Sequence, residues 1–331
     1  MKGLDISRKY YEEFAADAIR SEFSHLLPYL AIGLCGPGSE CLGYDDEISK
    51  DHDFEPGFCI FIPDEDRVSR RDAFLLQRFY DKLPKEYEGL RRSLVAPAGG
   101  PRRGVIRTAD FLLARTGTQT LPLSAEQWLR IPEQSLLEAV NGEIWFDGLG
   151  EMTALRSYLS EMPEDIRLKK LASYLLLAAQ SGQYNYSRCI SHGEKGAARL
   201  AAAEFVSSAT HVLMLLHGRY TPYYKWAFRA LRECEPIAAD RLEEILEGDA
   251  GGASLERPAE DPSSGSDAAD TSPDNTANLI EEVSSYIISL LQEQSLTKAT
   301  CGDLEKHAYS VNDRIEDGFL RNSDIFAGLN G

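Results

Sequence analysis

The chain has 331 residues, of which 43% are hydrophobic, and it carries a formal net charge of −18 at pH 7. This length suggests about two domains, and the hydrophobic content is high enough for packed cores, which excludes global disorder. The strong negative charge argues against nucleic-acid binding, because a sequence-independent coat on DNA or RNA needs a basic surface.

The same sequence predicts where the protein works. Its N-terminal residues are charged and lack the apolar core of a signal peptide, and no apolar run approaches the roughly 18 residues of a membrane span. We therefore expect a cytoplasmic protein without membrane association. A zinc site and a disulfide framework are poorly supported and reduced thiols are expected, since no C-x-x-C pair occurs among Cys35, Cys41, Cys59, Cys189, Cys234 and Cys301.

Up to about residue 150, hydrophobic periodicity predicts helices mixed with short strands. Gly, Pro and Asp residues separate the segments, as is typical of turns and loops. In chain order, the sequence predicts a helix over 6–28, strands over 30–35 and 58–62, a helix over 69–83, a loop over 95–104, a short strand over 105–108, helices over 124–130 and 133–140, and a strand over 143–146.

From residue 151 the pattern becomes helical throughout, with apolar spacing suited to a bundle. Residues 249–277 are rich in Gly, Ala, Ser, Pro and acids, and offer little to bury, which indicates a disordered acidic linker. The predicted helices are 151–161, 164–181, 196–217, 222–247 and a pair within 278–322; the predicted domains are 1–150 (α/β), 151–248 (helical bundle), the linker 249–277, and C-terminal helices over 278–331 that dock on the bundle.

One stretch combines residues suited to phosphate with residues suited to metal. The strand over 30–35 runs into a Gly-Pro-Gly-Ser turn, where backbone N–H groups and a hydroxyl at a possible helix start could receive phosphate oxygens. Asp51 and Asp53 are spaced so that an extended backbone projects both carboxylates to one face, and Mg²⁺ prefers such oxygen ligands. We predict a phosphate site at Gly38 and Ser39 beside a metal site at Asp51 and Asp53.

Simpler interpretations of these residues were compared with this one. A lone D-x-D is most often an acidic surface turn, and the Gly-Ser turn at a fixed distance is what favours a site. A calcium loop begun at Asp45 would need Gly at Lys50 and Glu at Pro56, and a dinucleotide fingerprint begun at Gly36 would need Gly at Cys41. A Walker loop is absent from the sequence.

The spacing of Gly38-Ser39, eleven residues and Asp51-x-Asp53 is similar to the core signature of the DNA polymerase beta-like nucleotidyltransferase superfamily. The longer string G-P-G-S-E-C-L-G-Y-D-D-E-I-S-K-D-H-D-F-E-P-G-F resembles an uncharacterised bacterial nucleotidyltransferase-like family of unknown function. Similarity continues at 141–147 and 216–226 and covers roughly 5–247. The resemblance implies an α+β fold, in which a small mixed-sheet nucleotidyltransferase domain precedes a helical bundle.

The resemblance also implies residue roles. Asp51 and Asp53 would hold Mg²⁺, and Gly38 and Ser39 would hold the β- and γ-phosphates of a nucleoside triphosphate. The superfamily has a third carboxylate on a later strand, for which we take Asp110, just beyond the strand at 105–108. Glu143 and Asp147 are alternatives for this carboxylate, but their positions are more typical of a closing strand and its turn than of a metal ligand.

Lys225 stands in a Tyr-Pro-Tyr-Tyr-Lys-Trp cluster in the helical half. It could contact the triphosphate, with Tyr223 or Tyr224 lining a base pocket. The structural alternative is a lysine whose stem lies along core aromatic residues while its charge stays in water.

These residues predict a Mg²⁺-dependent nucleotidyltransferase that moves a nucleoside monophosphate from a nucleoside triphosphate to an acceptor. The acidic charge favours a small, cationic or neutral acceptor over a polyanion. Two alternatives stay open. The break Glu55-Pro56-Gly57 after the acidic pair and the unassigned third acid suit a catalytically inactive nucleotide-binding regulatory module. The second alternative is a toxin–antitoxin type of nucleotidyltransferase that acts on protein or tRNA.

Overall fold

The structure is a computed structural model that describes residues 2–46, 55–92, 102–248 and 275–329. It divides into two compact units, Met1–Ile166 and Arg167–Leu329. The predicted boundary at residue 150 differs from this division because the helix that follows it, α8 (Glu151–Ser160), packs on α7 (Glu133–Val140) and on strand β6 of the first unit.

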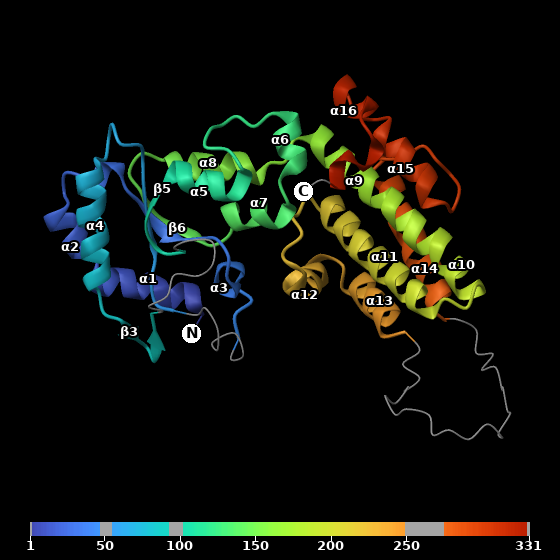
Figure 1. Cartoon of the computed structure of the whole chain (residues 1–331), viewed down its shortest axis with the longest axis horizontal. Coiled ribbons are helices and arrows are strands. Elements are labelled where there is room, and N and C mark those ends of the chain that lie inside the picture. Colours follow the sequence, from blue (N-terminus) through green and yellow to red (C-terminus); the bar gives the residue numbers. More distant parts are fainter. Residues whose placement is uncertain (1, 47–54, 93–101, 249–274, 330–331) are drawn as a thin grey trace, which may run out of the picture. The chain divides into compact units, whose positions relative to one another are not determined.

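The first unit contains a four-stranded sheet in the order β5-β2-β1-β6. The central strand β1 is antiparallel to both of its neighbours, whereas β2 and β5 are parallel. The sheet is therefore mixed, and the α+β fold class is confirmed. Figure 1 shows the elements coloured along the chain. Its strands are β1 (Ala31–Leu34), β2 (Cys59–Ile62), β5 (Gly104–Arg107) and β6 (Glu143–Asp147), while β3 (Glu86–Tyr87) and β4 (Leu90–Arg91) form a separate two-stranded sheet.

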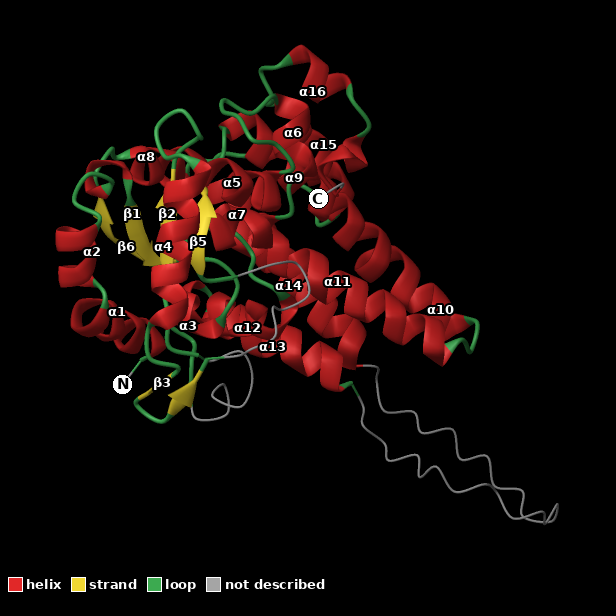
Figure 2. Ribbon diagram, turned by 60° about the vertical axis from the view of Figure 1, so that its left-hand side comes forward, coloured by secondary structure: helices red, strands yellow, loops and turns green. Residues whose placement is uncertain are grey.

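Alternation along the strands divides the side chains between two faces. Ile32, Ile60 and Ile62 share one buried cluster with residues of α1, α2 and α4. Phe61 lies on the opposite face, where its ring meets that of Phe111 in α5 with 5.2 Å between centroids. Figure 2 shows the strands in yellow among these helices. The helices of this unit, besides α7 and α8, are α1 (Gly3–Phe14), α2 (Ala16–Glu22), η1 (Leu27–Tyr29), α3 (Ser39–Leu42), α4 (Arg70–Lys82), α5 (Thr108–Thr116) and α6 (Ala125–Arg130).

In the described part of the second unit, every secondary-structure element is a helix. Its helix α11 packs against η3, α12, α13 and α14. Among the described helices, α11 alone is long and apolar enough to cross a membrane by length and composition, and 61% of its apolar window is buried inside the structure. The helices are α9 (Glu164–Ala178, which begins in the first unit), the π-helical η3 (Ala179–Tyr186), α10 (Ser187–Ser191), α11 (Lys195–Leu216), α12 (Tyr224–Cys234), α13 (Pro236–Glu247), α14 (Asn275–Glu293), α15 (Leu304–Asn312), α16 (Gly318–Asn322) and η4 (Ile325–Leu329).

Several predicted elements are divided or extended in the structure. The helix predicted over 222–247 is two helices, because Pro236 lacks a backbone N–H and begins a new helix. The helix predicted over 6–28 is likewise interrupted at Ala15 and ends by residue 22. The sequence reading missed α5. The predicted linker lies outside the described residues as far as residue 274, and α14 begins at Asn275.

Candidate functional site

A turn over Gly36–Ser39 follows the carboxyl end of β1 and leads directly into α3. Its backbone depends on glycine, since φ is +116° at Gly36 and +136° at Gly38. A Cβ on Gly38 would lie 2.5 Å from a carboxylate oxygen of Glu40. The second and fourth positions of the G-P-G-S sequence, Pro37 and Ser39, remain on the accessible side of the turn because both are only partly buried.

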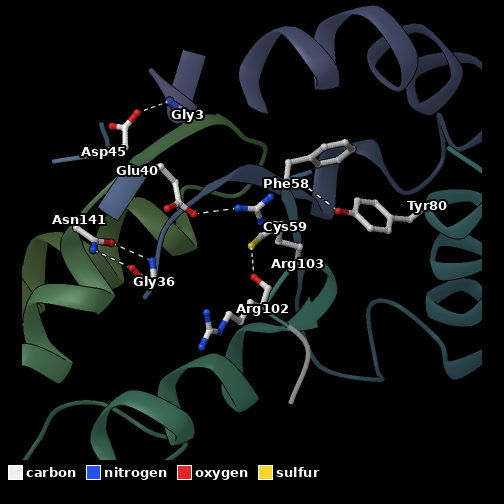
Figure 3. A network of polar contacts seen from close by, with 10 residues as sticks. All are labelled: Gly3, Gly36, Glu40, Asp45, Phe58, Cys59, Tyr80, Arg102, Arg103 and Asn141. Carbon is white, nitrogen blue, oxygen red and sulfur yellow. Dashed lines mark hydrogen bonds and ion pairs between the residues drawn. The ribbon is translucent and has the colours of Figure 1, made fainter. Parts of the chain in front are cut away.

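Asn141 holds this turn in place from the segment before β6. Its side-chain oxygen accepts a hydrogen bond from the Gly36 N–H at 2.9 Å, and its side-chain nitrogen donates to the Gly36 carbonyl at 2.9 Å (Figure 3). The next residue, Gly142, donates its N–H to the carbonyl of Cys41. A Cβ on Gly142 would lie 2.0 Å from the carbonyl oxygen of Leu34, so only glycine allows this approach.

A buried ion pair connects the turn to β5. The guanidinium of Arg103 contacts the carboxylate of Glu40 at 2.9 Å, and the two side chains are 8% and 6% exposed (Figure 3). Burial alone would lower the pKa of Arg103, but the Glu40 carboxylate and Tyr80 outweigh it, and the pKa lies above its ordinary value. The pair therefore stays charged and fixes α3 beside the start of β5.

The Glu55-Pro56-Gly57 break has a structural reason. Gly57 leaves room for Tyr80, whose hydroxyl would lie 2.6 Å from a Cβ at this position. That hydroxyl accepts a hydrogen bond from the Phe58 N–H at 3.2 Å. The break thus brings the chain into β2 beside the end of β1, where Gly33 pairs with Cys59.

The predicted phosphate ligands Gly38 and Ser39 stand at the beginning of α3. Neither the Ser39 hydroxyl nor the two amides of these residues hydrogen-bonds to any described residue. The turn therefore retains donors for an anion within the described part of the chain.

The predicted metal ligands Asp51 and Asp53 lie outside the described residues. Of the nearby acids that are described, Glu40 is paired with Arg103, and Asp45 accepts a hydrogen bond from the Gly3 N–H at 2.9 Å. The described residues contain no group of three or more His, Cys, Asp and Glu side chains that could hold a metal. The case for Mg²⁺ therefore depends on the donor chemistry of the two aspartates, which suits this hard cation.

Asp110 lies in the first turn of α5, not on a strand, and its side chain is exposed. β5 is parallel to β2, and β2 is antiparallel to β1. The end of β5 that leads to Asp110 therefore lies at the opposite end of the strands from the Gly36–Ser39 turn. Gln119 donates to its carboxylate at 3.3 Å. Of the alternatives, Glu143 begins β6, and Asp147 accepts hydrogen bonds from the amides at the start of α8.

A pocket of about 530 Å³ is lined both by the Gly36–Ser39 turn and by residues at the opposite end of the strands. We call it the turn pocket; it is lined by Cys35 and Pro37 of the turn, by residues of β2, α4 and β5, by Asp110 and Arg115 of α5, and by Glu138 of α7. Its volume suits a small-molecule ligand. Asp110 thus lines the same pocket as the turn, although it stands at the other end of the strands.

Glu138 is a half-buried acid of this pocket, paired with Arg115. Burial raises the pKa of its carboxyl, and Arg115 and Arg102 oppose that increase only in part. Perturbed carboxyl groups in pockets are common at functional sites. No motif singled out Arg115 or Glu138, because their approach depends on the packing of α5 against α7.

Three buried cysteines, Cys35, Cys41 and Cys59, surround the turn, and all are free thiols. Burial raises the pKa of Cys35 to about 11 and also raises the pKa of the other two. They are therefore protonated and act as small packing groups.

Lys225 belongs to the second unit, where it is exposed in the first turn of α12. Its ammonium lies 5.1 Å from the ring centre of Trp226, and Tyr223 and Tyr224 beside it are 48% and 76% exposed. The aromatic cluster around Lys225 is thus largely on the surface and is not a core.

The chain was compared with known protein families, curated proteins and solved structures. Residues 128–227 match a family described as a domain of unknown function (DUF4037). No curated protein matches the chain. Among solved structures, the chain is similar to a nucleotidyltransferase-like protein from Exiguobacterium sibiricum, at 13% sequence identity and a TM-score of 0.37, covering 92% of this chain and 80% of that chain.

Proposed function

We propose that the protein is a nucleotidyltransferase that moves a nucleoside monophosphate from a nucleoside triphosphate to a small-molecule acceptor. The observation that carries this proposal is the Gly36–Ser39 turn, held by Asn141 and by the Glu40–Arg103 pair, with donors at Gly38 and Ser39 that no described residue uses. The Asp51-x-Asp53 pair at the distance typical of the superfamily adds the acidic half of the site.

The roles proposed for the residues follow from their chemistry. The amides of Gly38 and Ser39 receive the β- and γ-phosphates. Lys225, which belongs to the second unit, remains a separate candidate for nucleotide binding. Asp51 and Asp53 would hold Mg²⁺, which when bound neutralises charge on the phosphate oxygens. Asp110 remains our candidate for the third carboxylate.

In the proposed transfer, the acceptor oxygen forms a bond to the α-phosphorus as the bond between that phosphorus and the bridging oxygen breaks. Pyrophosphate leaves, and the acceptor's proton passes to a carboxylate or to water. The protein contributes chiefly position and electrostatic stabilisation in such a reaction.

The test is transfer of label from α-³²P nucleoside triphosphates, with Mg²⁺ and a panel of small acceptors. We expect the double variant Asp51→Ala/Asp53→Ala to lose on the order of a hundredfold or more in rate. Asp17→Ala, an exposed acid of α2, is the matched control. Equal transfer by the double variant would overturn the assignment.

The same assay separates the alternatives. ATP binding by calorimetry without pyrophosphate release across the whole panel would indicate a nucleotide-binding regulatory module. Label that appears in protein or in tRNA would indicate a toxin–antitoxin type of enzyme.

A further inference from the structure

The turn pocket is more positive than the chain around it. It is lined by three guanidinium groups, those of Arg102, Arg107 and Arg115, and by the two carboxylates of Asp110 and Glu138, in a protein whose net charge is −18. A pocket with this balance does not suit a cation. It fits a ligand that carries negative charge.

The three arginines differ in which of their N–H donors are already used. Arg107 is occupied, because its guanidinium donates to the carbonyls of Pro63 at 2.6 Å and Val68 at 3.2 Å. Arg102 has interactions of its own. Arg115 uses Nη1 to pair with Glu138, whereas its Nε is buried and makes no hydrogen bond to any described residue.

Arg115 also reaches the turn. Its Nη2 lies 3.6 Å from the position that a Cβ on Gly36 would take. The guanidinium therefore lies close to the turn, at ordinary van der Waals distance from the space that a Cβ on Gly36 would fill. Arginine carries five N–H donors in a planar fork that matches phosphate oxygens. In Arg115, Nη1 is paired with Glu138, and the remaining nitrogens donate to no described residue.

We infer that Arg115 binds phosphate oxygens of the nucleotide at the Gly36–Ser39 turn, and that Glu138 holds the guanidinium in position until the anion arrives. This inference rests on the proposed function and adds to it a phosphate-binding residue from α5. Glu138 then has two effects of opposite sign. It orients Arg115, and its negative charge opposes the incoming phosphate.

The competing explanation is that the pair merely ties α5 to α7. In that case removal of either partner has the same consequence, a looser contact between the helices. A phosphate ligand behaves differently, because removal of Arg115 weakens anion binding while removal of the charge on Glu138 strengthens it.

The test is calorimetric titration of the full chain with inorganic pyrophosphate and with ATP, each with Mg²⁺ and with EDTA. We expect Arg115→Gln to weaken binding of both by about tenfold or more, and Arg115→Lys to retain part of the affinity. Glu138→Gln should tighten binding by about threefold. Arg130→Gln, an exposed arginine of α6 paired with Glu126, is the control and should bind like the wild type.

The outcomes distinguish a failure of the inference about Arg115 from a failure of the proposed function. If the wild type binds ATP and Arg115→Gln binds it equally well, the inference is wrong and the proposed function stands. If Arg115→Gln and Glu138→Gln weaken binding alike, the pair is structural and the inference is again wrong. If the wild type binds neither ligand under any of these conditions, the proposed function fails as well. Circular dichroism and thermal unfolding of each variant verify that it is folded.

Discussion

Gly38 has a φ of +136°, and the carboxylate of Glu40 fills the space where a Cβ would stand. Glu40 cannot move aside freely because it is buried and paired with Arg103. At the scale of single residues, the shape of the turn thus depends on one missing side chain and on one buried ion pair. Ordinary helix or strand propensity does not enter at this position.

We expect Gly38→Ala to destabilise the protein by about 1–3 kcal/mol, because a side chain in this backbone region is strained and would press on the Glu40 carboxylate. Urea unfolding measures the change. Gly196→Ala is the control: this glycine stands in α11 with open space around it, and alanine should stabilise the helix by about 0.5–1 kcal/mol. A neutral effect of Gly38→Ala would contradict the turn geometry.

Glu138 should contribute a specific pH dependence. Burial raises the pKa of the Glu138 carboxyl in the folded state above its ordinary value. A carboxyl with a raised folded pKa contributes stability that is fully present below its unfolded pKa and is lost as pH rises through the folded pKa.

Wild type should therefore lose stability relative to Glu138→Gln as the pH rises from about 4.5 through the raised pKa of Glu138. The difference between the urea unfolding free energies of the two proteins, measured across this range, isolates the effect from other carboxyl groups. A difference that stays flat, or that changes in favour of the wild type, would show that the pKa is not raised.

At the scale of elements, close approaches at glycine decide which segments can pack together. Gly142 lets the segment before β6 lie against β1, and Gly182 lets the π-helical η3 lie against α11. A Cβ on Gly182 would stand 2.3 Å from the ring of Phe205, a residue that is fully buried. The π-helical turn and the glycine together bring η3 close to α11.

Gly182→Ala should accordingly cost about 1–3 kcal/mol in unfolding free energy by overpacking this contact. Its effect should shrink when Phe205 is replaced by Leu, because the smaller side chain removes the clash. A double-mutant cycle over the two positions measures this coupling. Additive effects would show that the two residues do not meet as described.

At the scale of the whole molecule, α9 makes polar contacts with the C-terminal helices of the second unit. Lys169 is fully buried in α9 and donates to the side-chain oxygen of Asn312 and to the carbonyl of Ser323, both at 3.0 Å. One lysine thus joins α9 to the ends of α15 and α16. Burial lowers the pKa of Lys169.

Lys169→Met keeps much of the side-chain volume but removes both hydrogen bonds and leaves two partly buried acceptors without this donor, at a cost of about 1–3 kcal/mol. Hydrogen exchange should then speed up in α15 and α16 before it does in α11. The exposed Lys298→Met should stay within about 0.5 kcal/mol of the wild type. Unchanged exchange in the C-terminal helices would contradict this role.

The sequence by itself determined the fold class, most strands and helices, and the position of the Gly36–Ser39 turn after β1. These features follow from local patterns: apolar periodicity, glycines and prolines at fixed places, and motif spacing. The sequence analysis included residues 141–147 in the family resemblance, but gave Asn141 and Gly142 no role, because their contacts with the turn depend on the fold. The roles of Asp51, Asp53, Asp110 and Lys225 remain predictions.

Only the tertiary structure decided which residues share a site. Arg115 of α5 pairs with Glu138 of α7, and Arg103, just before β5, pairs with Glu40 of α3. No spacing along the chain could indicate either pair. The domain boundary at Ile166 and the position of Asp110 opposite the turn depend likewise on strand direction and helix packing. The physical reason is that charge pairing and burial depend on distances in space, whereas local patterns report only the nearest neighbours along the chain.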